Sequence, residues 1–504
     1  MDKNNQKSAE AQPLPPIARK SVESGLISER AVAETRRPIT SVSESVNFDF
    51  TTIGAASVRK GLTQIGGNLS GNILGVYYYV DSVDASPSSK LLVVCGTAVS
   101  YLSSPSAYTT IRNVTAGYKA RFTTYLNYAF MVNGVDATAI WDGTAGSFVT
   151  TGNALNAPIG KFIENYRSRV WIAGNSTYPS RIYYSSIPSS VTTPVILWDT
   201  DVATGQWIDV SPSDGEAITG LMRNRNAMLI FKPNHLYRLF SITSVDADPY
   251  FAVGTSSQES IIETKAGIFF HHASGFYNYN IYGQVQEISR PILDIVRSIP
   301  VTAYENVAGW LEMDGDHLCW YVGTCTVNGI TYQNLVLRYS IAAQVWTHRT
   351  YPFKLLNGLQ RQPLYNDGTV QVVVVGSDQG KTYQFNTGKT DAGATIPYSL
   401  VHSWDRLDDL LTTRKTIMQG VFVHRGGSGT HVEYQIESDV KGMDESGDWT
   451  KNVGELKQYD TGFNAMNIKG RKIRFRVSGE SSGEPFLYFG YELIGVVPEF
   501  MQFS

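Results

Sequence analysis

From about residue 46 to 395 the chain repeats one pattern of apolar and polar positions. The unit is a short apolar run, a tight turn containing Gly, Asn or Asp, and a second run rich in aromatic residues. "SRVWIAGNSTYPSRIYYSS" (168–186) and "VQVVVVGSDQGKTYQFN" (370–386) are examples. Apolar runs of this length bounded by turn residues favour antiparallel β-hairpins.

The spacing of the apolar runs predicts how the hairpins assemble. Successive runs are about 40 to 60 residues apart, which is about the length of one four-stranded propeller blade. We therefore predict an all-β protein whose main body is a β-propeller of six or seven blades. Arg290–Pro300 is the exception and predicts a short helix, because Pro291 suits a first turn and Pro300 ends it. The run centres are Val93, Phe130, Val170, Leu229, Phe269, Cys319 and Val373.

The pattern changes on either side of this body. After residue 396, stretches such as "TIMQGVFVHRGGSGTHVEYQIESD" alternate apolar and polar residues, which predicts a C-terminal antiparallel β-sandwich over 396–504. Residues 1–45 carry few large apolar groups and include "AQPLPPIARK", which favours extended backbone. This segment is either a disordered tail or an extended N-terminal arm that becomes ordered on a neighbouring subunit. The predicted organisation is 1–45 arm, 46–395 propeller and 396–504 sandwich.

The alternation also predicts which sandwich side chains face inward. Because side chains of a strand point alternately to its two faces, alternate apolar positions should share the buried side. The predicted inward residues are Val421, Val423, Val432, Tyr434, Ile436, Ile473, Phe475 and Val477.

Composition agrees with a β-rich protein and argues against tight nucleic-acid binding. Among 504 residues, charged residues make up only 17%, while Gly numbers 45 and Tyr 29. Tyr is frequent in strands and Gly in turns, whereas a helical bundle would need more Ala, Glu, Lys and Leu. The formal net charge is −3, so no overall basic field neutralises phosphates.

The cysteines and the N-terminal residues carry little further signal. Cys95, Cys319 and Cys325 are too few for a disulfide framework, and we expect buried free thiols. The first twenty residues lack the apolar core of a secretory signal. The chain also contains no apolar run of the length that spans a bilayer, so we expect no membrane association.

A search for catalytic or metal-binding motifs predicts neither an enzyme nor a cofactor. No nucleophile elbow, phosphate-binding Gly loop or His-Glu-x-x-His motif occurs. His271 and His272 are adjacent on a predicted strand, so their rings should point to opposite faces, one inward and one exposed. The acidic stretches 245–249, 313–317 and 443–449 lack the closing Glu of a calcium loop and are typical of Asp-Gly turns. We assign no catalytic, cofactor-binding or metal residue.

Two further features have a structural and a functional interpretation. "GSDQGKTY" (376–383) approximates the Asp-box hairpin of sialidase-like propellers, where that hairpin is a structural turn. "YYYV" (77–80), "IYYSS" (182–186) and "FYNYNIYG" (276–283) are candidate sugar platforms, because aromatic rings offer rigid amphipathic surface. The structural interpretation, half-buried strand tyrosines, is the favoured one.

Several stretches resemble proteins of short-tailed phage tails. These are "SVNFDFTTIGAASVRKGLTQIGG" (45–67), "GKFIENYRSRVWIAGNSTYPSRIYYSSI" (160–187), "EAITGLMRNRNAMLIFKPNHLYRLFSI" (216–242) and "ESIIETKAGIFFHHASGFYNYNIYGQVQEISRPILDIVRSI" (259–299). In their residue pattern and in their order along the chain they are similar to the tail-hub, or nozzle, family of packaged-DNA-stabilisation proteins. The resemblance covers nearly the whole chain after residue 45.

The resemblance implies a structural virion protein made in the host cytoplasm. It implies a homo-oligomeric ring, typically a hexamer, below the portal-adaptor ring, with tail fibres or spikes and distal tail proteins as further partners. Such a ring would retain the packaged DNA and serve as the conduit for genome ejection, with genomic DNA passing through its lumen without tight binding. The arm would clasp a neighbouring subunit or the adaptor ring.

Two other interpretations remain open at this point. One is a carbohydrate-binding or depolymerase-type propeller acting in host receptor recognition, and the other is a cellular scaffold propeller. A sugar-cleaving enzyme would need paired carboxylates over a central cavity, and no such pair can be chosen from spacing alone.

Overall fold

A computed structural model describes most of the chain and divides it into two compact units. Unit 1 comprises Met1–Leu62, Gln344–Thr350 and Asn386–Ser504, and unit 2 comprises Thr63–Ala343 and Tyr351–Phe385. The described residues are 17–20, 42–52, 55–80, 89–144, 154–188, 196–201, 203–224, 227–242, 244–247, 252–360, 373–405, 414–426, 430–440, 445–451, 457–463, 468–483 and 486–499.

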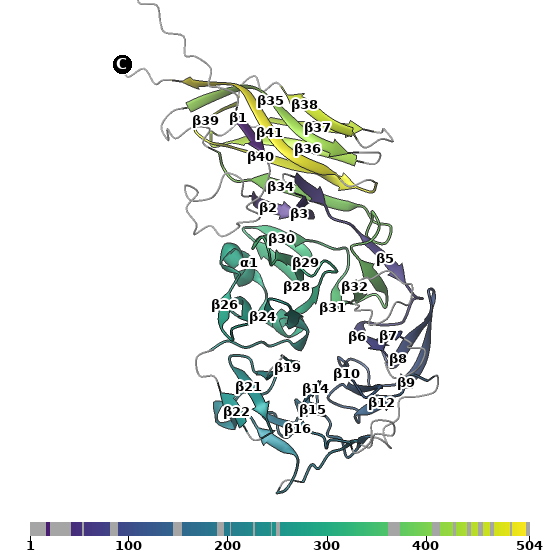
Figure 1. The fold of residues 1–504 in the computed structure, drawn as a ribbon. Helices are drawn as coiled ribbons and strands as arrows, with labels where there is room; N and C mark the ends of the chain where they lie inside the picture. Colours follow the sequence, from purple (N-terminus) through teal and green to yellow (C-terminus); the bar gives the residue numbers. More distant parts are fainter. Residues whose placement is uncertain are drawn as a thin grey trace, which may run out of the picture. The chain divides into compact units, whose positions relative to one another are not determined.

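Unit 2 is built from consecutive small antiparallel sheets, here called sheets 1 to 7, that surround a common centre (Figure 1). Sheet 1 contains β6 (Ile73–Val80), β7 (Ser89–Cys95), β8 (Ala98–Ser104) and β9 (Ala107–Asn113); sheet 2 β10 (Arg121–Tyr125), β11 (Tyr128–Val132) and β12 (Ala139–Trp141); sheet 3 β14 (Phe162–Tyr166), β15 (Arg169–Ala173), β16 (Arg181–Tyr184) and β18 (Trp207–Asp209); sheet 4 β19 (Gly220–Arg223), β20 (Met228–Phe231), β21 (Leu236–Ser241) and β22 (Ser244–Ala247). Sheet 5 contains β23 (Ile262–Thr264), β24 (Gly267–His272), β25 (Gly275–Asn280) and β26 (Val285–Glu287); sheet 6 β27 (Ala308–Leu311), β28 (His317–Val327) and β29 (Ile330–Ser340); sheet 7 β31 (Leu355–Gln360), β32 (Val373–Ser377), β33 (Thr382–Phe385) and β5 (Leu62–Ile65).

Short elements connect these sheets. The parallel pair β13 and β17 lies in the connections before and within sheet 3, and the helical turns η4 and α1 follow sheet 5. The predicted helix over 290–300 is thus confirmed, with Pro291 in its first turn as expected. These elements are β13 (Ala154–Leu155), β17 (Ile196–Leu197), η2 (Pro212–Asp214), η3 (Gln258–Ser260), η4 (Arg290–Ile292), α1 (Leu293–Ser298) and η5 (Val301–Asn306).

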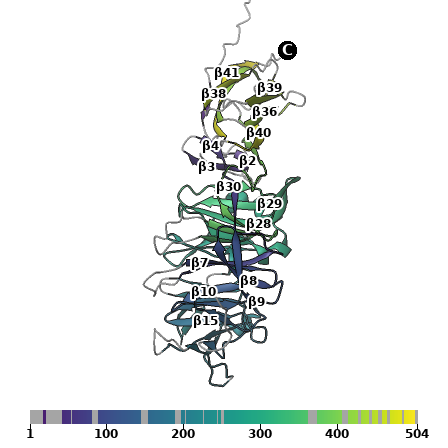
Figure 2. The ribbon, with the colours of Figure 1, turned by 90° about the vertical axis from the view of Figure 1, so that its right-hand side faces the viewer.

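The sheets of unit 2 follow one another around the ring (Figures 1 and 2). Apolar side chains of each sheet pack on the next, and those of sheet 7 pack on sheet 1. A strand covered on both faces can be apolar throughout, which explains the run Val373–Val375 of β32. Truncating one such buried aliphatic side chain to Ala costs about 2–5 kcal/mol. Representative pairs across the seven interfaces are Val94 and Met131, Phe130 and Ile172, Trp171 and Met228, Phe231 and Phe270, Phe276 and Trp320, Trp310 and Phe385, and Val93 and Val374.

The ring closes by joining the start of unit 2 to its end. β5 precedes sheet 1 in the chain but pairs with β33 of sheet 7. The Thr382 hydroxyl, on β33, donates to the Ile65 carbonyl oxygen over 3.0 Å. The Tyr108 hydroxyl, in sheet 1, lies 2.5 Å from the Thr382 hydroxyl. Closure therefore leaves few sheet edges to solvent, which is the β-propeller solution to the edge problem.

Unit 1 contains two facing sheets made from three separate parts of the chain. One sheet has the order β3-β4-β41-β35-β38, with β1 on β41 and β39 on β35, and the unit 1 strands of the other have the order β30-β2-β34-β40-β36-β37. Their strands are β1 (Ile17–Lys20), β2 (Val42–Val46), β3 (Phe48–Thr52), β4 (Ala55–Val58), β30 (Trp346–Arg349), β34 (Ile396–His402), β35 (Arg414–Gly426), β36 (Thr430–Ser438), β37 (Glu445–Lys451), β38 (Lys457–Phe463), β39 (Ile468–Gly470), β40 (Ile473–Ser481) and β41 (Leu487–Glu499).

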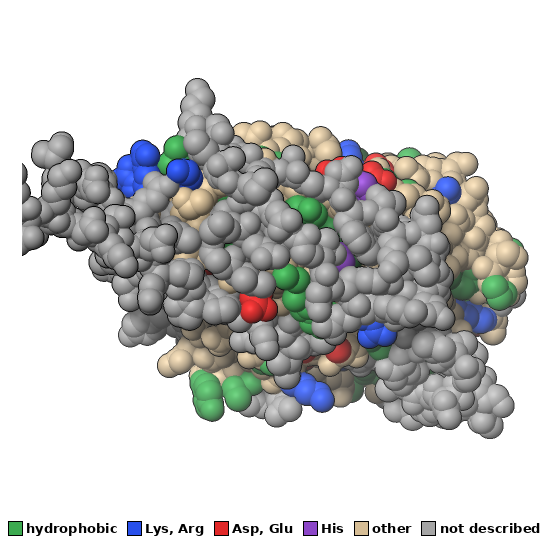
Figure 3. All heavy atoms as spheres, turned by 90° about the horizontal axis from the view of Figure 1, so that it is seen from above, with side chains coloured by type: hydrophobic (Ala, Val, Ile, Leu, Met, Phe, Trp, Pro, Cys, Tyr) green, Lys and Arg blue, Asp and Glu red, His purple; other side chains and the backbone are tan. Residues whose placement is uncertain are grey.

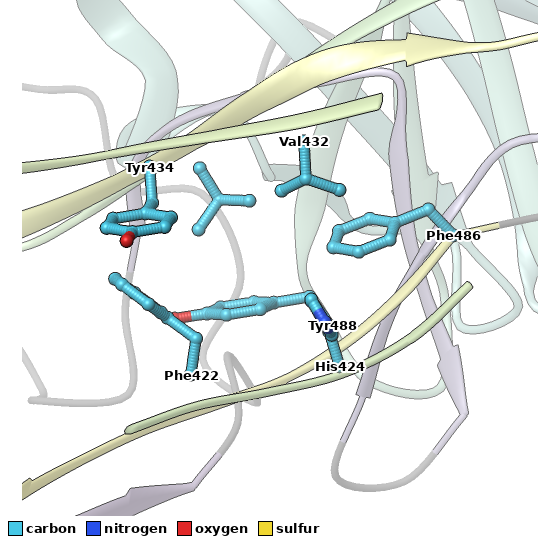
Figure 4. Close-up of a pocket in the computed structure, with 7 residues that line it drawn as sticks. Phe422, His424, Val432, Tyr434, Phe486 and Tyr488 are labelled. Carbon is cyan, nitrogen blue, oxygen red and sulfur yellow. The ribbon is translucent and has the colours of Figure 1, made fainter. Parts of the chain in front are cut away.

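Aromatic side chains fill the space between the two sheets of unit 1. Phe475 of β40 stacks on Tyr491 of β41 with ring centroids 3.9 Å apart, and it meets Phe422 of β35 edge-on at 5.7 Å. A gap of about 10 Å³ lies in this core. Its lining side chains include Phe422, His424 and Tyr488 (Figure 4). A gap of that size holds one water molecule at most, so it belongs to core packing.

The predicted inward faces were right for two strands and wrong for the third. Val432, Ile436, Ile473, Phe475 and Val477 are buried, and Tyr434 is half-buried. On β35, in contrast, Phe422 and His424 are buried and Val421 and Val423 are half-buried. A shift of one residue exchanges the two faces of a strand, and here the larger aromatic rings take the core positions.

The strand content bears out the all-β prediction, and the two units divide the chain differently from the predicted boundaries. Residues 46–62 and 386–395, predicted to be propeller, lie in unit 1. Of the predicted arm, the structure describes 17–20 and 42–45; β1 pairs antiparallel with β41, matching Ala18 with Glu492. The rest of the arm lies outside the described residues.

Candidate functional site

The inner side of the ring is formed by the first strand of each sheet, and it carries a row of polar side chains near the strand ends. The Tyr77 hydroxyl lies 2.7 Å from the Thr124 hydroxyl, and the Asn165 amide donates to the Thr124 carbonyl over 2.6 Å. The Arg223 guanidinium then donates to the Asn165 side-chain oxygen over 2.6 Å. These four residues belong to sheets 1 to 4, so the row follows the inside of the ring.

Glu164 lies beside this row, and the pKa of its carboxyl is raised. Burial raises the pKa of its carboxyl, Arg223 lowers it and Glu263 of sheet 5 raises it, which together put the pKa at about 7. Two glutamates and one arginine thus share the inside of the ring. A carboxyl with a pKa near neutrality can exchange a proton at physiological pH.

A second charged cluster, here called the clamp, crosses the ring near the starts of the first strands. Arg121 and Lys119, at the start of sheet 2, pair with Glu259 before sheet 5 at 2.7 and 3.3 Å. Lys119 also donates to the Glu305 carbonyl oxygen, before sheet 6, over 2.7 Å. Sheet 2 is not a ring neighbour of sheets 5 and 6, so these bonds span the interior and fix opposite sides of the ring.

The protonation state of Glu259 agrees with its position in the clamp. Burial alone would raise the pKa of its carboxyl, but Arg121 and Lys119 outweigh that effect and lower the pKa to about 2. The carboxylate is therefore charged throughout the physiological range, and the clamp is an ion-pair cluster and not an acid–base pair.

Two groups of side chains have the composition of a metal site, and in both groups carboxylate oxygens already bind a Lys or Arg side chain. Both Asp214 oxygens lie 2.7 Å from the buried Lys232 ammonium. Both Glu312 oxygens accept from Arg338, at 2.8 and 3.0 Å. A metal ion would have to displace a buried cation in each case, so these groups are internal ion pairs. The group with Asp214 also contains Glu216 and His235, and the group with Glu312 also contains Asp314 and His317.

The predicted acidic turn at 313–317 forms a hydrogen-bonded loop. The Asp314 carboxylate accepts from the backbone N–H groups of Asp316 and His317 at 2.9 and 3.1 Å. For the other acidic stretches, 248–249 and 443–444 lie outside the described residues. Asp side chains in turns commonly accept hydrogen bonds from backbone N–H groups in this way.

The prediction for the two histidines was half right. Their rings belong to different environments, but both are buried, with 1% and 9% of the residue exposed for His271 and His272. His271 lies against Phe276 and Tyr304, and burial lowers its pKa to about 3. His272 accepts from or donates to the Ser274 hydroxyl at 2.7 Å. The expected exposed ring is covered because sheets 4 and 6 flank sheet 5.

The cysteines and the Asp-box-like hairpin have structural surroundings. Cys95, Cys319 and Cys325 are buried free thiols, as predicted, and burial raises the pKa of Cys325 to about 11. In the hairpin between β32 and β33, the Ser377 hydroxyl donates to the Lys381 carbonyl oxygen over 2.9 Å. Gly380 has φ of 68° and lies so close to Leu69 that a side chain would not fit.

The tyrosine-rich stretches differ in exposure. Tyr79 and Tyr183 are buried, and Tyr77 is half-buried with its pKa raised to about 12, chiefly by burial. In "FYNYNIYG" Tyr279 is buried, whereas Tyr282 is 81% exposed. Among the tyrosines of these three stretches, Tyr282 is therefore the one placed as a platform for a ligand.

The fold and this ring interior define a β-propeller-like protein with a second all-β unit. No protein-family model and no curated protein sequence matches the chain. Among solved structures, it is similar to the Pan2 WD40 domain of Neurospora crassa, with 7% identity, 65% of this chain and 95% of that chain covered, and a TM-score of 0.40. It is also similar to Sqt1 of Saccharomyces cerevisiae, with 10% identity, coverage of 65% and 99%, and a TM-score of 0.40. Similarity at this level carries no argument beyond the strand pairing described above.

The described surface and helices add two observations. Viewed as in Figure 3, the visible basic and acidic side chains are scattered and not grouped by sign. No helix among the described residues is long and apolar enough to cross a bilayer.

Proposed function

We propose that this chain is a structural component of a short-tailed phage tail, a seven-bladed propeller with a sandwich unit that assembles into a ring of identical subunits. The observation that carries the proposal is the rigid closure of unit 2. Seven apolar interfaces and β5 close the ring from outside, and the clamp fixes it from inside. A tube wall needs this stiffness and needs no catalytic group.

The clamp also bears on where DNA would pass. Lys119, Arg121 and Glu259 join opposite sides of the propeller, so the passage within one subunit is crossed by side chains. In the proposed assembly the DNA channel is therefore the space enclosed by several subunits. The weak net charge of −3 suits such a wall, because strong phosphate binding would retard the DNA.

The partners in this proposal follow from the sequence resemblance. They are further copies of the chain in a ring of six, the portal-adaptor ring, and tail fibres or spikes with the distal tail proteins. β1 supports a role of the arm in assembly, because a short strand separated from β2 by residues 21–41 can pair equally with β41 of its own or of another subunit.

Native mass spectrometry of the full chain tests the proposal, together with electron microscopy of virions that carry a tagged copy. We expect ring-shaped oligomers that form reversibly with concentration, and density for the tag in the tail. Double-stranded DNA should not be retained at 150 mM salt. A protein that stays monomeric at about 100 µM and is absent from purified particles would rule the proposal out.

A further inference from the structure

Turns of sheets 4, 5 and 6 enclose a groove of about 1030 Å³ in unit 2, here called the turn-side groove. Its lining includes Phe240, Glu263, Lys265, Tyr279 and Tyr282. The volume is that of a site for several sugar rings or a drug-sized ligand, and the lining combines aromatic surface with groups of both charges.

The turn at 280–283 presents two exposed apolar side chains to this groove. Ile281 is 67% exposed and Tyr282 is 81% exposed. Burying such side chains would be favourable, so their exposure at the rim of a groove marks a contact surface.

The same turn is rigid. The Asn280 side-chain oxygen accepts from the backbone N–H groups of Tyr282 and Gln284 at 2.9 and 3.0 Å, and Gly283 adopts φ of 78° and donates to the Asn280 carbonyl oxygen. The backbone that carries Tyr282 is therefore held in place before any ligand binds, which lowers the entropy lost on binding.

A smaller basic pocket adjoins the groove. That pocket, of about 390 Å³, is lined by Tyr125, Asn165, Arg167 and Arg223, and shares Asn224 with the turn-side groove. Arg167 is exposed and has φ of 47°, a left-handed conformation that is unfavourable for this residue type. Ser168 has φ of 58°, so Arg167 and Ser168 form the two-residue turn between β14 and β15, and this turn places Arg167 in the lining of the pocket.

The lining disfavours one other class of ligand. Glu263 and the carboxylates of Asp314 and Asp316 lie in the same groove as Lys265, so the groove is not the continuous basic track that a phosphate on every nucleotide requires. A polysaccharide can place the uncharged parts of its rings in this groove and a carboxylate at the basic pocket beside Arg167 and Arg223.

We infer that the turn-side groove and the basic pocket together bind an acidic polysaccharide. A sugar ring stacks on Tyr282, Glu263 and Lys265 accept from and donate to hydroxyl groups, and Arg167 and Arg223 receive a sugar carboxylate. Aromatic stacking and planar guanidinium pairs are the contacts that pyranose faces and carboxylates favour. The inference does not depend on the tail assembly proposed above.

Affinity electrophoresis of the full chain tests this inference, in gels cast with polygalacturonate, hyaluronate, or neutral dextran. We expect retardation by at least one acidic polysaccharide and none by dextran. Tyr282→Ala should weaken binding about tenfold, which corresponds to 1.4 kcal/mol. Tyr118→Ala, at another exposed tyrosine of unit 2, is the matched control and should leave binding unchanged.

Arg167→Asn separates the charged contact from stability. Asn accepts the left-handed conformation, so the turn should stay intact while the guanidinium is lost. Retardation by the acidic polysaccharide should fall severalfold, with an unchanged melting temperature. No retardation by any polysaccharide, equal retardation by dextran or by double-stranded DNA, or retardation unaffected by Tyr282→Ala would overturn the inference.

Discussion

Both units are built from strands and turns, but the strands pair locally along the chain in unit 2 and over long stretches of the chain in unit 1. In unit 2 each sheet takes its strands from one short stretch of chain, as sheet 1 does from residues 73–113, and only β5 comes from elsewhere. In unit 1 a single strand, β41, pairs with β4 and β35, whose positions in the chain differ by several hundred residues. Local pairing leaves a repeating pattern in the sequence, and non-local pairing leaves none.

The clamp of unit 2 also differs in exposure from a buried ion pair of unit 1. Unit 2 puts its clamp on the ring interior, where Glu259 keeps 14% of its side chain exposed. Unit 1 buries Arg59 and Asp391 completely, at 0% and 1%, with oxygens and nitrogens as close as 2.6 Å. Arg59 also donates to Asn47 and to the Thr350 carbonyl, so one guanidinium joins all three chain segments of unit 1.

The largest effect should follow from breaking this buried pair. Arg59→Met leaves the Asp391 carboxylate buried without its partner, and we expect a loss of about 3–5 kcal/mol in the free energy of unfolding. Urea unfolding monitored by circular dichroism measures it. The double variant Arg59→Met/Asp391→Leu should be clearly more stable than the single variant; equal stability would show that the charge is not the cause.

The clamp of unit 2 should contribute less. Glu259→Gln leaves Lys119 and Arg121 facing one another, and we expect a loss of about 2 kcal/mol at pH 7. The folded pKa of about 2 lies below the ordinary value, so this stabilisation is complete above about pH 5 and is lost as pH falls towards 2. Glu305→Gln is the control, because Glu305 contributes a backbone oxygen; a difference between wild type and Glu259→Gln that persists at pH 2 would contradict the assignment.

Glu164 should show the opposite pH dependence. Its folded pKa of about 7 lies above the ordinary value, so its contribution to stability is complete below pH 4.5 and is lost as pH rises through 7. Glu164→Gln should therefore stabilise the protein by about 1–2 kcal/mol at pH 8.5, a figure reduced for the partial exposure of the side chain. Thermal unfolding at pH 4.5 and 8.5 measures this, and a stabilisation of equal size at both pH values would refute it.

An exposed pair completes the comparison with the smallest effect. Arg290 is 82% exposed and lies 3.4 Å from Glu287. Because solvent screens such pairs, Arg290→Ala should change the free energy of unfolding by no more than about 0.5 kcal/mol. A loss comparable with that of Arg59→Met would mean that burial does not distinguish the ion pairs of this protein.

Much of the local structure could be predicted from the sequence. The apolar runs centred near Val170 and Leu229 are strands of sheets 3 and 4, and the helix after Pro291 forms where its boundaries indicated. These features depend on side-chain size, turn residues and proline, which act over a few neighbouring residues. The burial of the three cysteines follows from the same apolar surroundings.

The candidate sites could not be predicted in this way. Sequence inspection marked "FYNYNIYG" as a possible platform, yet only the structure separates exposed Tyr282 from buried Tyr279. Glu164, Arg223 and Glu263 gave no signal, because they lie on three different strands and share no motif. The same is true of Lys119 and Glu259, which are 140 residues apart in the chain.

The sequence by itself therefore determined the strands, the turns and the repetition that favours a ring of sheets, since each depends on contacts between near neighbours. Only the tertiary structure decided that residues 46–62 join unit 1, that Phe422 and not Val421 faces its core, and that charges from opposite sides of the ring meet inside it. These outcomes depend on which surfaces of distant segments fit together, and contacts between segments far apart in the chain leave no local pattern in the sequence.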